Sequence, residues 1–566
     1  MAAARVRDSR GALRELTIRA IGLGVLLALI LGAANAYLGL YAGLTVSASI
    51  PAAVISMAIL RALGGGTILE NNVVQTVASA GEAVAAGAIF TFPALIILGT
   101  YTHLPYWRTT LLSAAGGTLG SLLVVFLRRA YIVEEKLPYP EGIACAQVLR
   151  AGAGESPRTA MLMWGALLAG IVKTAQDIAG LLPGAVSATG RVGRAVFEGS
   201  LNLSGALVGI GYIIGLRIAS LVFAGGAFAW LIAVPVITAV RPGLRDLSAA
   251  EAAAKAWSET ARYTGVGAML VGGVLTLWRM RKAISRALSE SIRMARSGES
   301  SPRPREDTDL APRTILIGSA CCIPLMVLLY YSATGSIGLS VALALALSII
   351  AFFATSIAGY LTGIVGASNN PVSGVTVIVL LAAALLLKAL GVAGSVGPQL
   401  AIMVGAVVCT SAAMAGDSLH DLATGFHLGA TPRNLEIAVL IGAIASSLII
   451  APVLNMLIAG YGIAGTATAR RGALAAPQAF LMAKVTGGVF AGGLPWTAIV
   501  AGAVIATGLG ILDRRLEQVG SLWRTPVMPV AIGLYLPFGL SFAILAGAVV
   551  RSAFSEARSD QAGPQL

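Results

Sequence analysis

Long apolar stretches recur along the chain from about Ile18 to Val550, separated by short polar loops. A helix needs roughly 20 residues to cross a bilayer, and we count about fourteen to sixteen stretches of that kind. Several are broken by glycine or proline. The alternation that marks the strands of a membrane barrel is absent. The pattern therefore predicts an all-α, polytopic membrane protein with about 14–16 transmembrane helices, including re-entrant or broken ones.

Composition and charge support this prediction. The chain has 566 residues, of which 57% are hydrophobic and only 11% charged, with mean hydropathy +0.86. A soluble protein would be nearer 25% charged. The net charge of +14 lies mostly in loops and segment ends, as the positive-inside rule predicts, so we expect no nucleic-acid partner. The basic N-terminus has no small-residue cleavage site, so the first apolar run is expected to remain as a membrane anchor.

One stretch that is plainly outside the membrane divides the chain. Residues 279–313 are dense in arginine, serine and proline. The predicted order is a cytoplasmic N-terminal tail (1–17), a first membrane repeat (18–278), a basic cytoplasmic linker (279–313), a second membrane repeat (314–552) and a C-terminal tail (553–566).

The two membrane parts resemble each other in the same order. The aligned pairs are "YLGLYAG" at Tyr37 with "YLTGIVG" at Tyr360, the "ALG" ending at Gly64 with that ending at Gly391, "ASAGEA" with "AMAGDS" (Glu82 with Asp417), "LPYPEGIACAQV" from Leu137 with "LAAPQAFLMAKV" from Leu474, and "GYIIGL" near Tyr212 with "LYLPFGL" near Tyr535. Five matches in one order indicate an internal duplication.

Charge and parity predict that the repeats are inverted. The N-terminus and residues 279–313 are both basic, so both are expected in the cytoplasm with an even number of crossings between them. One further segment, "TILIGSACCIPLMVLLYY", precedes the second repeat, which therefore starts from the opposite side. Inverted repeats are typical of secondary transporters. The same count places Arg551 and Arg558 outside, against the charge rule.

A carboxylate interrupts the apolar stretch Thr76–Gly99. Glu82 lies between glycine-broken halves, although an ionisable group at membrane depth costs at least about 2.5–3.5 kcal/mol. Gly81 and Gly87 would each weaken a helix by roughly 1 kcal/mol, which suits a broken segment. Two carboxylates, Glu82 and Asp417, at a shared axis would favour each other's protonated form, as a proton-binding site requires. The open alternative is that each caps the N-terminus of a half-helix.

Two further polar stretches carry proton-coupling candidates. On a helix, Asp417, His420 and Asp421 share one face, so they could relay protons or contact a metal chelate, unless the stretch is a solvated or capping turn. The spacing is too generic for a metal site built by the protein, and the four cysteines indicate no disulfide framework. Glu141 falls in the first turn of a helix that Pro138 and Pro140 prevent from starting earlier, where it faces either a cavity or an ordinary interfacial loop.

Amides and tyrosines beside the broken segments are candidates for substrate binding. The motifs "ENNVVQT" and "GASNNPVSG" place five amides where they could bind a peptide backbone or hydrogen-bond freed main chain. The candidates are Tyr37, Asn71, Asn72, Gln75, Tyr139, Gln147, Asn369 and Asn370.

The motifs together resemble one transporter family. "NAYLGLYAGLTVSASIP", "ASAGEAVAAGAIFTFPAL", "KLPYPEGIACAQVLRAG", "GIVGASNNPVSG", "MAGDSLHDLATGFHLGATPR" and "LYLPFGLS" are similar to the oligopeptide transporter (OPT) family, in particular its prokaryotic and yellow-stripe-like branch. The resemblance covers about Leu16 to Val550. It implies proton-coupled uptake of small peptides or of metal complexed by peptide-like chelators. We expect a peptide substrate first and a metal chelate second.

Other classes of function fit less well. A channel usually needs symmetric rings of pore-lining groups. The chain has three histidines and no HExxH, GxSxG or P-loop motif, which argues against an enzyme and against direct use of ATP. The sequence thus predicts a multi-pass transporter of the cytoplasmic membrane without a cofactor. Its expected partners are a peptide or peptide-like chelate, protons and lipid, and a homodimer is left open.

Overall fold

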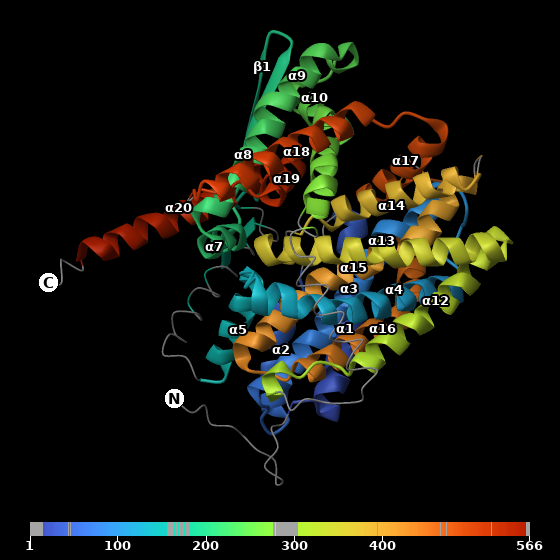
Figure 1. Ribbon diagram of the computed structural model, residues 1–566, viewed down its shortest axis with the longest axis vertical. Helices are drawn as coiled ribbons and strands as arrows, with labels where there is room; N and C mark the ends of the chain where they lie inside the picture. The colour runs from blue at the N-terminus through green and yellow to red at the C-terminus, as the bar shows by residue number, and fades with distance from the viewer. Residues whose placement is uncertain are drawn as a thin grey trace. The chain divides into compact units, whose positions relative to one another are not determined.

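The computed structural model describes residues 15–561, apart from 43–44, 46, most of 155–180, 276–277, 279–303, 369, 393, 395, 465, 471–472 and 522. This part of the chain is almost entirely helical (Figure 1), which confirms the all-α prediction. Strands β1 (Ala185–Val192) and β2 (Ala195–Asn202) pair antiparallel as a hairpin, with Ala185 opposite Asn202.

The helices form two compact units, and each unit takes segments from both halves of the chain. Unit 1 comprises Met1–Thr159 and Met280–Leu494, and unit 2 comprises Ala160–Arg279 and Pro495–Leu566. Unit 1 contains α1 (Ile18–Ala42), α2 (Ser49–Ala62), α3 (Ile68–Ile97), α4 (Tyr106–Arg128) with the π-helical turn Arg129–Glu134, α5 (Pro140–Gly152), α12 (Pro312–Thr334), α13 (Ile337–Val365), α14 (Val372–Ala389), α15 (Val396–Leu428), α16 (Pro432–Tyr461) and α17 (Pro477–Ala491). Unit 2 contains the hairpin, α7 (Gly205–Ile214), α8 (Leu216–Phe228), α9 (Val234–Val240), α10 (Ala249–Ala256), α18 (Trp496–Gln518), α19 (Val527–Tyr535) and α20 (Phe538–Gln561).

Ten helices among the described residues are long and apolar enough to span a membrane. Other apolar segments form shorter helices, such as α2 and Phe538–Ala553. The half-helices α5 and α17 have 13 and 15 residues, too few for a full crossing. The apolar stretches counted from the sequence therefore divide into full spans and short or interrupted helices.

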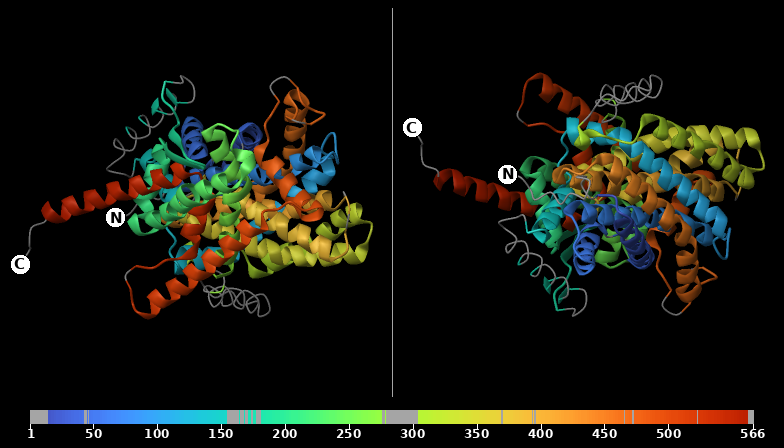
Figure 2. Two further views of the ribbon diagram at one scale, coloured as in Figure 1. Left: turned by 90° about the horizontal axis from the view of Figure 1, so that it is seen from above. Right: turned by 90° about the horizontal axis from the view of Figure 1, so that it is seen from below.

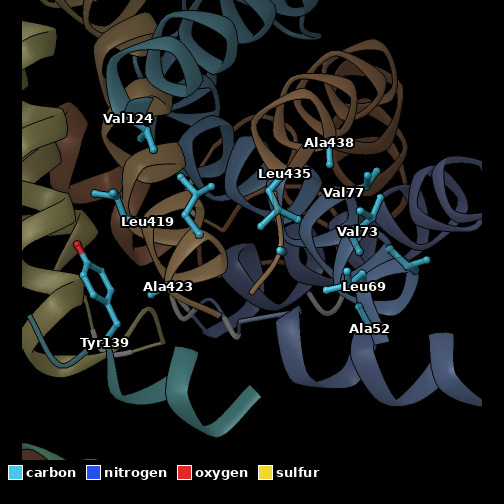
Figure 3. Close-up of a cluster of buried hydrophobic side chains, with 14 of the residues drawn as sticks. Ala52, Leu69, Val73, Val77, Val124, Tyr139, Leu419, Ala423, Leu435 and Ala438 are labelled. Atoms are coloured by element: carbon cyan, nitrogen blue, oxygen red, sulfur yellow. The ribbon is translucent and has the colours of Figure 1, made fainter. Parts of the chain in front are cut away.

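Helices α3 and α15 form the interior of unit 1 (Figure 1), and both are almost wholly buried. Helix α3 packs on α1, α15 and α16, and α15 packs in the same manner on α13, α3 and α4. A cluster of buried apolar side chains joins them to α4 and α16 (Figure 3); it includes Leu69, Val73, Val77, Val124, Leu419, Ala423, Leu435 and Ala438. The two repeats thus share one core, and neither could bury its long central helix alone.

Contacts at one end of unit 1, which we call the Glu15 end, show that α3 and α15 run in opposite directions. Glu70 at the start of α3 accepts a hydrogen bond from Thr17 (2.8 Å). Glu15, two residues before Thr17, accepts hydrogen bonds from Thr431 (backbone N–H, 3.2 Å) and Asn434 (2.7 Å), which follow the end of α15. Helix α3 therefore begins where α15 ends, as two inverted repeats require.

The half-helices exchange contacts between the repeats. The residue before each half-helix, Tyr139 or Ala476, has the left-handed backbone conformation, with φ of 38° and 41°. The N–H of Tyr139 donates to the carbonyl oxygen of Gly363 in α13 (2.9 Å), and that of Ala476 donates to Leu40 in α1 (2.8 Å). Each half-helix is thus anchored on the first helix of the other repeat. Reciprocal contacts of this kind are the mark of a twofold relation.

Close helix contacts correct one alignment made from the sequence. A Cβ on Gly116 (α4) would lie 2.5 Å from the carbonyl oxygen of Val407 (α15), and one on Gly442 (α16) would lie 2.2 Å from that of Val77 (α3). Val77 and Val407 therefore occupy equivalent places, and the starts of α3 and α15 agree with this register. Glu82 then corresponds to Ala412, not to Asp417. The alignment of "SAGE" with "MAGD" was wrong by more than one helical turn, because small residues recur throughout both helices and make such short matches common.

The Gly442 contact gives a test of this packing. Gly442→Leu should destabilise the protein by about 3 kcal/mol or more, because the added side chain would force α16 away from the backbone of α3. The matched control is Gly22→Leu, since Gly22 is exposed in α1 and has open space around its Cα. Thermal unfolding of the purified proteins would measure the difference. Equal melting temperatures for the two variants would contradict the close contact between α3 and α16.

Unit 2, taken by itself, also has a twofold relation between segments of the two repeats. Gly211 (α7) abuts the backbone of Ile544 (α20), and Gly533 (α19) abuts Val222 (α8). A second pair of contacts, Gly225 with Val530 and Gly547 with Val208, repeats this arrangement. In each pair of contacts, the two glycines are 322 positions apart in the sequence, and so are their two contact partners. This offset confirms the alignment of Tyr212 with Tyr535 to within a residue. Figure 2 shows α20 continuing past the helices of unit 2 that it packs against.

Candidate functional site

Two carboxyl groups meet in the interior of unit 1. Glu82 on α3 and Asp417 on α15 are 3% and 8% exposed, and their carboxyl groups lie close enough for the charge of each to act on the other. The amide of Asn35 on α1 donates to Glu82. Two carboxyl groups buried close together disfavour the state in which both are charged. The pair can therefore hold one proton between two elements that belong to different repeats.

A second acidic group lies about one turn along α15. Asp421 is fully buried and accepts hydrogen bonds from Ser49 of α2 (3.0 Å) and from Gln75 of α3. The Ser49 hydroxyl also lies within hydrogen-bond distance of the Ser79 hydroxyl on α3 (3.1 Å). Here side chains of three helices converge on one carboxylate, so this stretch is not a solvated turn.

His420 stands beside this group. Its Nδ1 lies 3.4 Å from Ser49 Oγ and 3.6 Å from Asp421 Oδ1. Among the described residues, its Nε2 is buried without a hydrogen-bond partner, as are Asp421 Oδ2 and the amide of Asn72. Buried polar atoms of this kind normally bind a protein group, water or ligand. The arrangement can accept water, a proton or a polar part of a substrate.

Glu141 lies at the break between α13 and α14. Its carboxylate accepts hydrogen bonds from the backbone N–H (3.2 Å) and the hydroxyl (3.3 Å) of Ser368. Ser368 Oγ in turn accepts a hydrogen bond from the N–H of Ser47, at the break between α1 and α2. A half-helix of the first repeat and the interrupted segments of both repeats therefore meet at this point.

The other candidates divide into two groups. Gln75 donates to Asp421, whereas the Asn72 amide lies near Gly425, four residues further along α15. Asn370 donates to Thr362 (2.8 Å), with its amide against Gly416 next to Asp417. Asn369 lies outside the described residues.

Four candidates have no contact with the buried acids in the structure. Asn71 bonds to Ser56 and to the backbone at the start of α3. The hydroxyl of Tyr139 donates to Gly359 (3.1 Å) and holds α5 in place. Tyr37 stacks on Tyr41 and lies tilted against Tyr461, and Gln147 is exposed. In the sequence, a polar residue beside a broken helix looks the same whether it anchors the helix or faces the site. The sequence therefore could not separate these four residues from those at the site.

Asn35, Ser49 and Ser79 were not among the sequence candidates. Asn35 could have been found, since it stands alone as an amide in the apolar run of α1. Serines are common in membrane helices and carry no comparable signal. No group of three His, Cys, Asp or Glu side chains placed to hold a metal ion occurs in the part of the chain that the structure describes.

Inverted repeats joined through half-helices, with protonatable groups buried where the repeats meet, define a polytopic membrane transporter. The comparisons agree. The family model described as OPT oligopeptide transporter protein matches residues 15–565, and the chain belongs to this family. A relative from Haemophilus influenzae (strain ATCC 51907 / DSM 11121 / KW20 / Rd), named "Putative oligopeptide transporter", is 34% identical over 536 residues, which cover 90% of this chain and 84% of the relative.

Proposed function

We propose that this protein is a proton-coupled symporter that carries small oligopeptides across the cytoplasmic membrane. The observation that supports the proposal most directly is the buried contact of Glu82 with Asp417. A charge held there without a partner would cost several kcal/mol, so the site favours states in which a proton is bound. The substrate class is that of the family and of the named relative.

Alternating access follows from the twofold relation of the repeats. The contact of α5 with α13 is equivalent to that of α17 with α1. Unit 1 can therefore adopt two related arrangements, which differ in which of these two contacts is closely packed. Within the described part of the chain, the ion network at the Glu15 end, where Arg305 bonds to Glu15, has no counterpart at the equivalent place of the other repeat. We infer that this network favours closure of the Glu15 end.

The proposed coupling uses the residues of both repeats. Substrate enters between them and contacts the first turn of α5 and the break before α14, where Glu141 and Asn370 lie. Protonation of Glu82 or Asp417 removes a buried charge and permits the carboxyl–carboxyl contact across the two repeats. Release of that proton on the other side separates α3 from α15 locally and resets the cycle.

The orientation follows from charge. The basic N-terminus and the basic linker are continuous with Glu15 and Arg305, which form an ion pair. We propose that the Glu15 end faces the cytoplasm. The predicted even number of crossings between these two segments is consistent with that ion pair.

Uptake into proteoliposomes with an imposed pH gradient tests the proposal. Peptides of two to six residues should accumulate above their external concentration, and a protonophore should abolish the accumulation. An iron–chelate complex is measured in parallel. Gradient-driven accumulation of the chelate alone would replace the peptide with the alternative substrate, and unsaturable flux that is independent of the gradient would indicate a channel.

A further inference from the structure

A surface cavity of about 330 Å³ lies at a break between two helices of unit 2. Helix α7 ends and α8 begins at Gly215, whose φ of 80° suits glycine. Helix α20 packs on both α7 and α8. The cavity is lined by all three helices, and its lining includes Arg217 of α8 and Arg551 of α20. Two arginines therefore share one cavity, and its volume falls within the range of ligand sites.

The cavity lies at the level of a membrane surface. The candidate span Leu216–Val240 begins at this cavity, and the apolar helix Phe538–Ala553 ends there. Tyr212 and Leu216 are exposed beside the break, and Val550 is exposed next to Arg551. Ends of apolar helices, with an exposed tyrosine among them, are typical of the boundary between hydrocarbon and headgroups. A ligand of this cavity can therefore come from the bilayer itself.

The guanidinium group of Arg551 is held in place by the end of α7. Its Nη1 donates hydrogen bonds to the carbonyl oxygens of Tyr212 (3.1 Å) and Ile213 (2.7 Å). Carbonyl groups in the last turn of a helix lack partners within the helix, so these bonds fix the arginine firmly. Among the described residues, Arg551 forms no ion pair with a carboxylate. Its Nε and Nη2 groups are thus oriented in advance for another acceptor.

Arg217 adds a second positive charge to the cavity. It lies in the first turn of α8 and is exposed. In the ranges that the structure describes, its side chain forms neither a hydrogen bond nor an ion pair. The first N–H groups of α8 also lack partners within the helix and carry a partial positive charge. The two guanidinium groups and this helix end together favour an anion.

The twofold relation of unit 2 shows that its fold does not require these charges. At the offset of 322 residues, Arg217 and Arg551 correspond to Gly539 and Ala229. At the equivalent break, between α19 and α20, the indole of Trp230 donates to the carbonyl oxygen of the residue after α19 (3.4 Å). A neutral donor is sufficient to cap a helix end there. The two arginines therefore point to a ligand of one repeat only.

We propose that this cavity binds the phosphodiester headgroup of an anionic phospholipid. A phosphate group offers two oxygens to the planar fork of each arginine. Basic pockets between membrane helices commonly hold headgroups of this kind. The level of the cavity favours a lipid over phosphate from solution, and the exposed apolar side chains beside it can contact the acyl chains. The inference is independent of the transported substrate.

Thermal unfolding of the purified full-length protein in a neutral detergent tests the proposal. The protein is titrated separately with phosphatidylglycerol, phosphatidylcholine and inorganic phosphate. Phosphatidylglycerol should raise the unfolding temperature in a saturable manner, and the other two should not. Arg217→Gln should weaken the apparent Kd for phosphatidylglycerol roughly fivefold, and Arg217→Gln combined with Arg551→Gln roughly 30-fold.

The matched control is the double variant Arg194→Gln with Arg245→Gln. These two arginines are exposed in unit 2, do not line the cavity and change the net charge by the same amount, so their variant should bind as the wild type does. Arg551→Lys keeps the charge and should bind more tightly than Arg551→Gln. Arg217→Gln removes no hydrogen bond among the described residues, so it tests the proposal even where Arg551→Gln fails to fold.

Three results would overturn the proposal. The first is a wild-type shift that is no larger with phosphatidylglycerol than with phosphatidylcholine. The second is an Arg217→Gln protein that binds as tightly as the wild type, or a control pair that is weakened as much as the pair at the cavity. The third is an equal shift with inorganic phosphate, which would replace the lipid with an ion from solution.

Discussion

Glu82→Gln should abolish accumulation of substrate driven by a pH gradient while leaving part of the exchange of substrate across the membrane. Glutamine keeps the size and the hydrogen-bonding capacity of Glu82 but cannot gain or lose a proton. The contact with Asp417 would then persist in every state, so the gradient could no longer drive the transition between them. We expect a loss of about 100-fold or more in gradient-driven accumulation, about the effect of removing 2.7 kcal/mol of coupling.

The matched control is Glu135→Gln. Glu135 is exposed between α4 and α5, so its substitution should leave accumulation unchanged. Initial uptake with and without a gradient, and exchange in preloaded proteoliposomes, are measured for both variants. Normal accumulation by Glu82→Gln would remove Glu82 from the coupling mechanism.

Arg128→Met should lower the free energy of unfolding by about 3–5 kcal/mol, because it leaves buried carboxylates without their partner. Arg128 at the end of α4 is 2% exposed and forms ion pairs with Asp309 (2.6 Å) and Asp307 (3.2 Å). Glu436 at the start of α16 is also buried there and accepts a hydrogen bond from the N–H of Leu310 (2.6 Å). Thermal or denaturant unfolding of the purified protein measures the loss.

The neighbouring residue provides the control for this prediction. Arg129 pairs with Asp307 (3.3 Å) but is 35% exposed, so Arg129→Met should cost no more than about 1 kcal/mol. Adding Asp309→Asn to Arg128→Met should restore part of the lost stability, since it removes one uncompensated charge. An Arg128→Met protein as stable as Arg129→Met would show that the ion network does not hold the Glu15 end together.

The fold class could be predicted from the sequence because apolar length alone distinguishes membrane helices. The inverted repeats could be predicted from parity and from sparse motifs in which a special backbone is needed. The proline after the left-handed residues Tyr139 and Ala476 is the clearest of these, since it aligns both half-helices correctly. The division into two units that each combine segments from both halves is a matter of tertiary packing and left no local trace.

The candidate site was predicted less completely. An acidic residue in an apolar helix is costly wherever it stands, so Glu82, Asp417 and Asp421 could be selected without a structure. Their partners Asn35, Ser49 and Ser79 come from other helices and could not. The alignment of Glu82 with Asp417 was wrong, yet the two side chains are neighbours. Helices α3 and α15 pack antiparallel near the twofold axis of the repeats, where residues that are not equivalent also come close together.

Side-specific labelling of two single cysteines tests the inverted arrangement most directly. His103 follows the end of α3 and His427 lies at the end of its counterpart α15, and each is at least partly accessible. In a background without Cys145, Cys321, Cys322 and Cys409, a membrane-impermeant thiol reagent is applied to intact cells and to inverted vesicles carrying His103→Cys or His427→Cys. We expect labelling of position 103 from outside and of position 427 from the cytoplasm. Labelling of both positions from the same side would contradict the account.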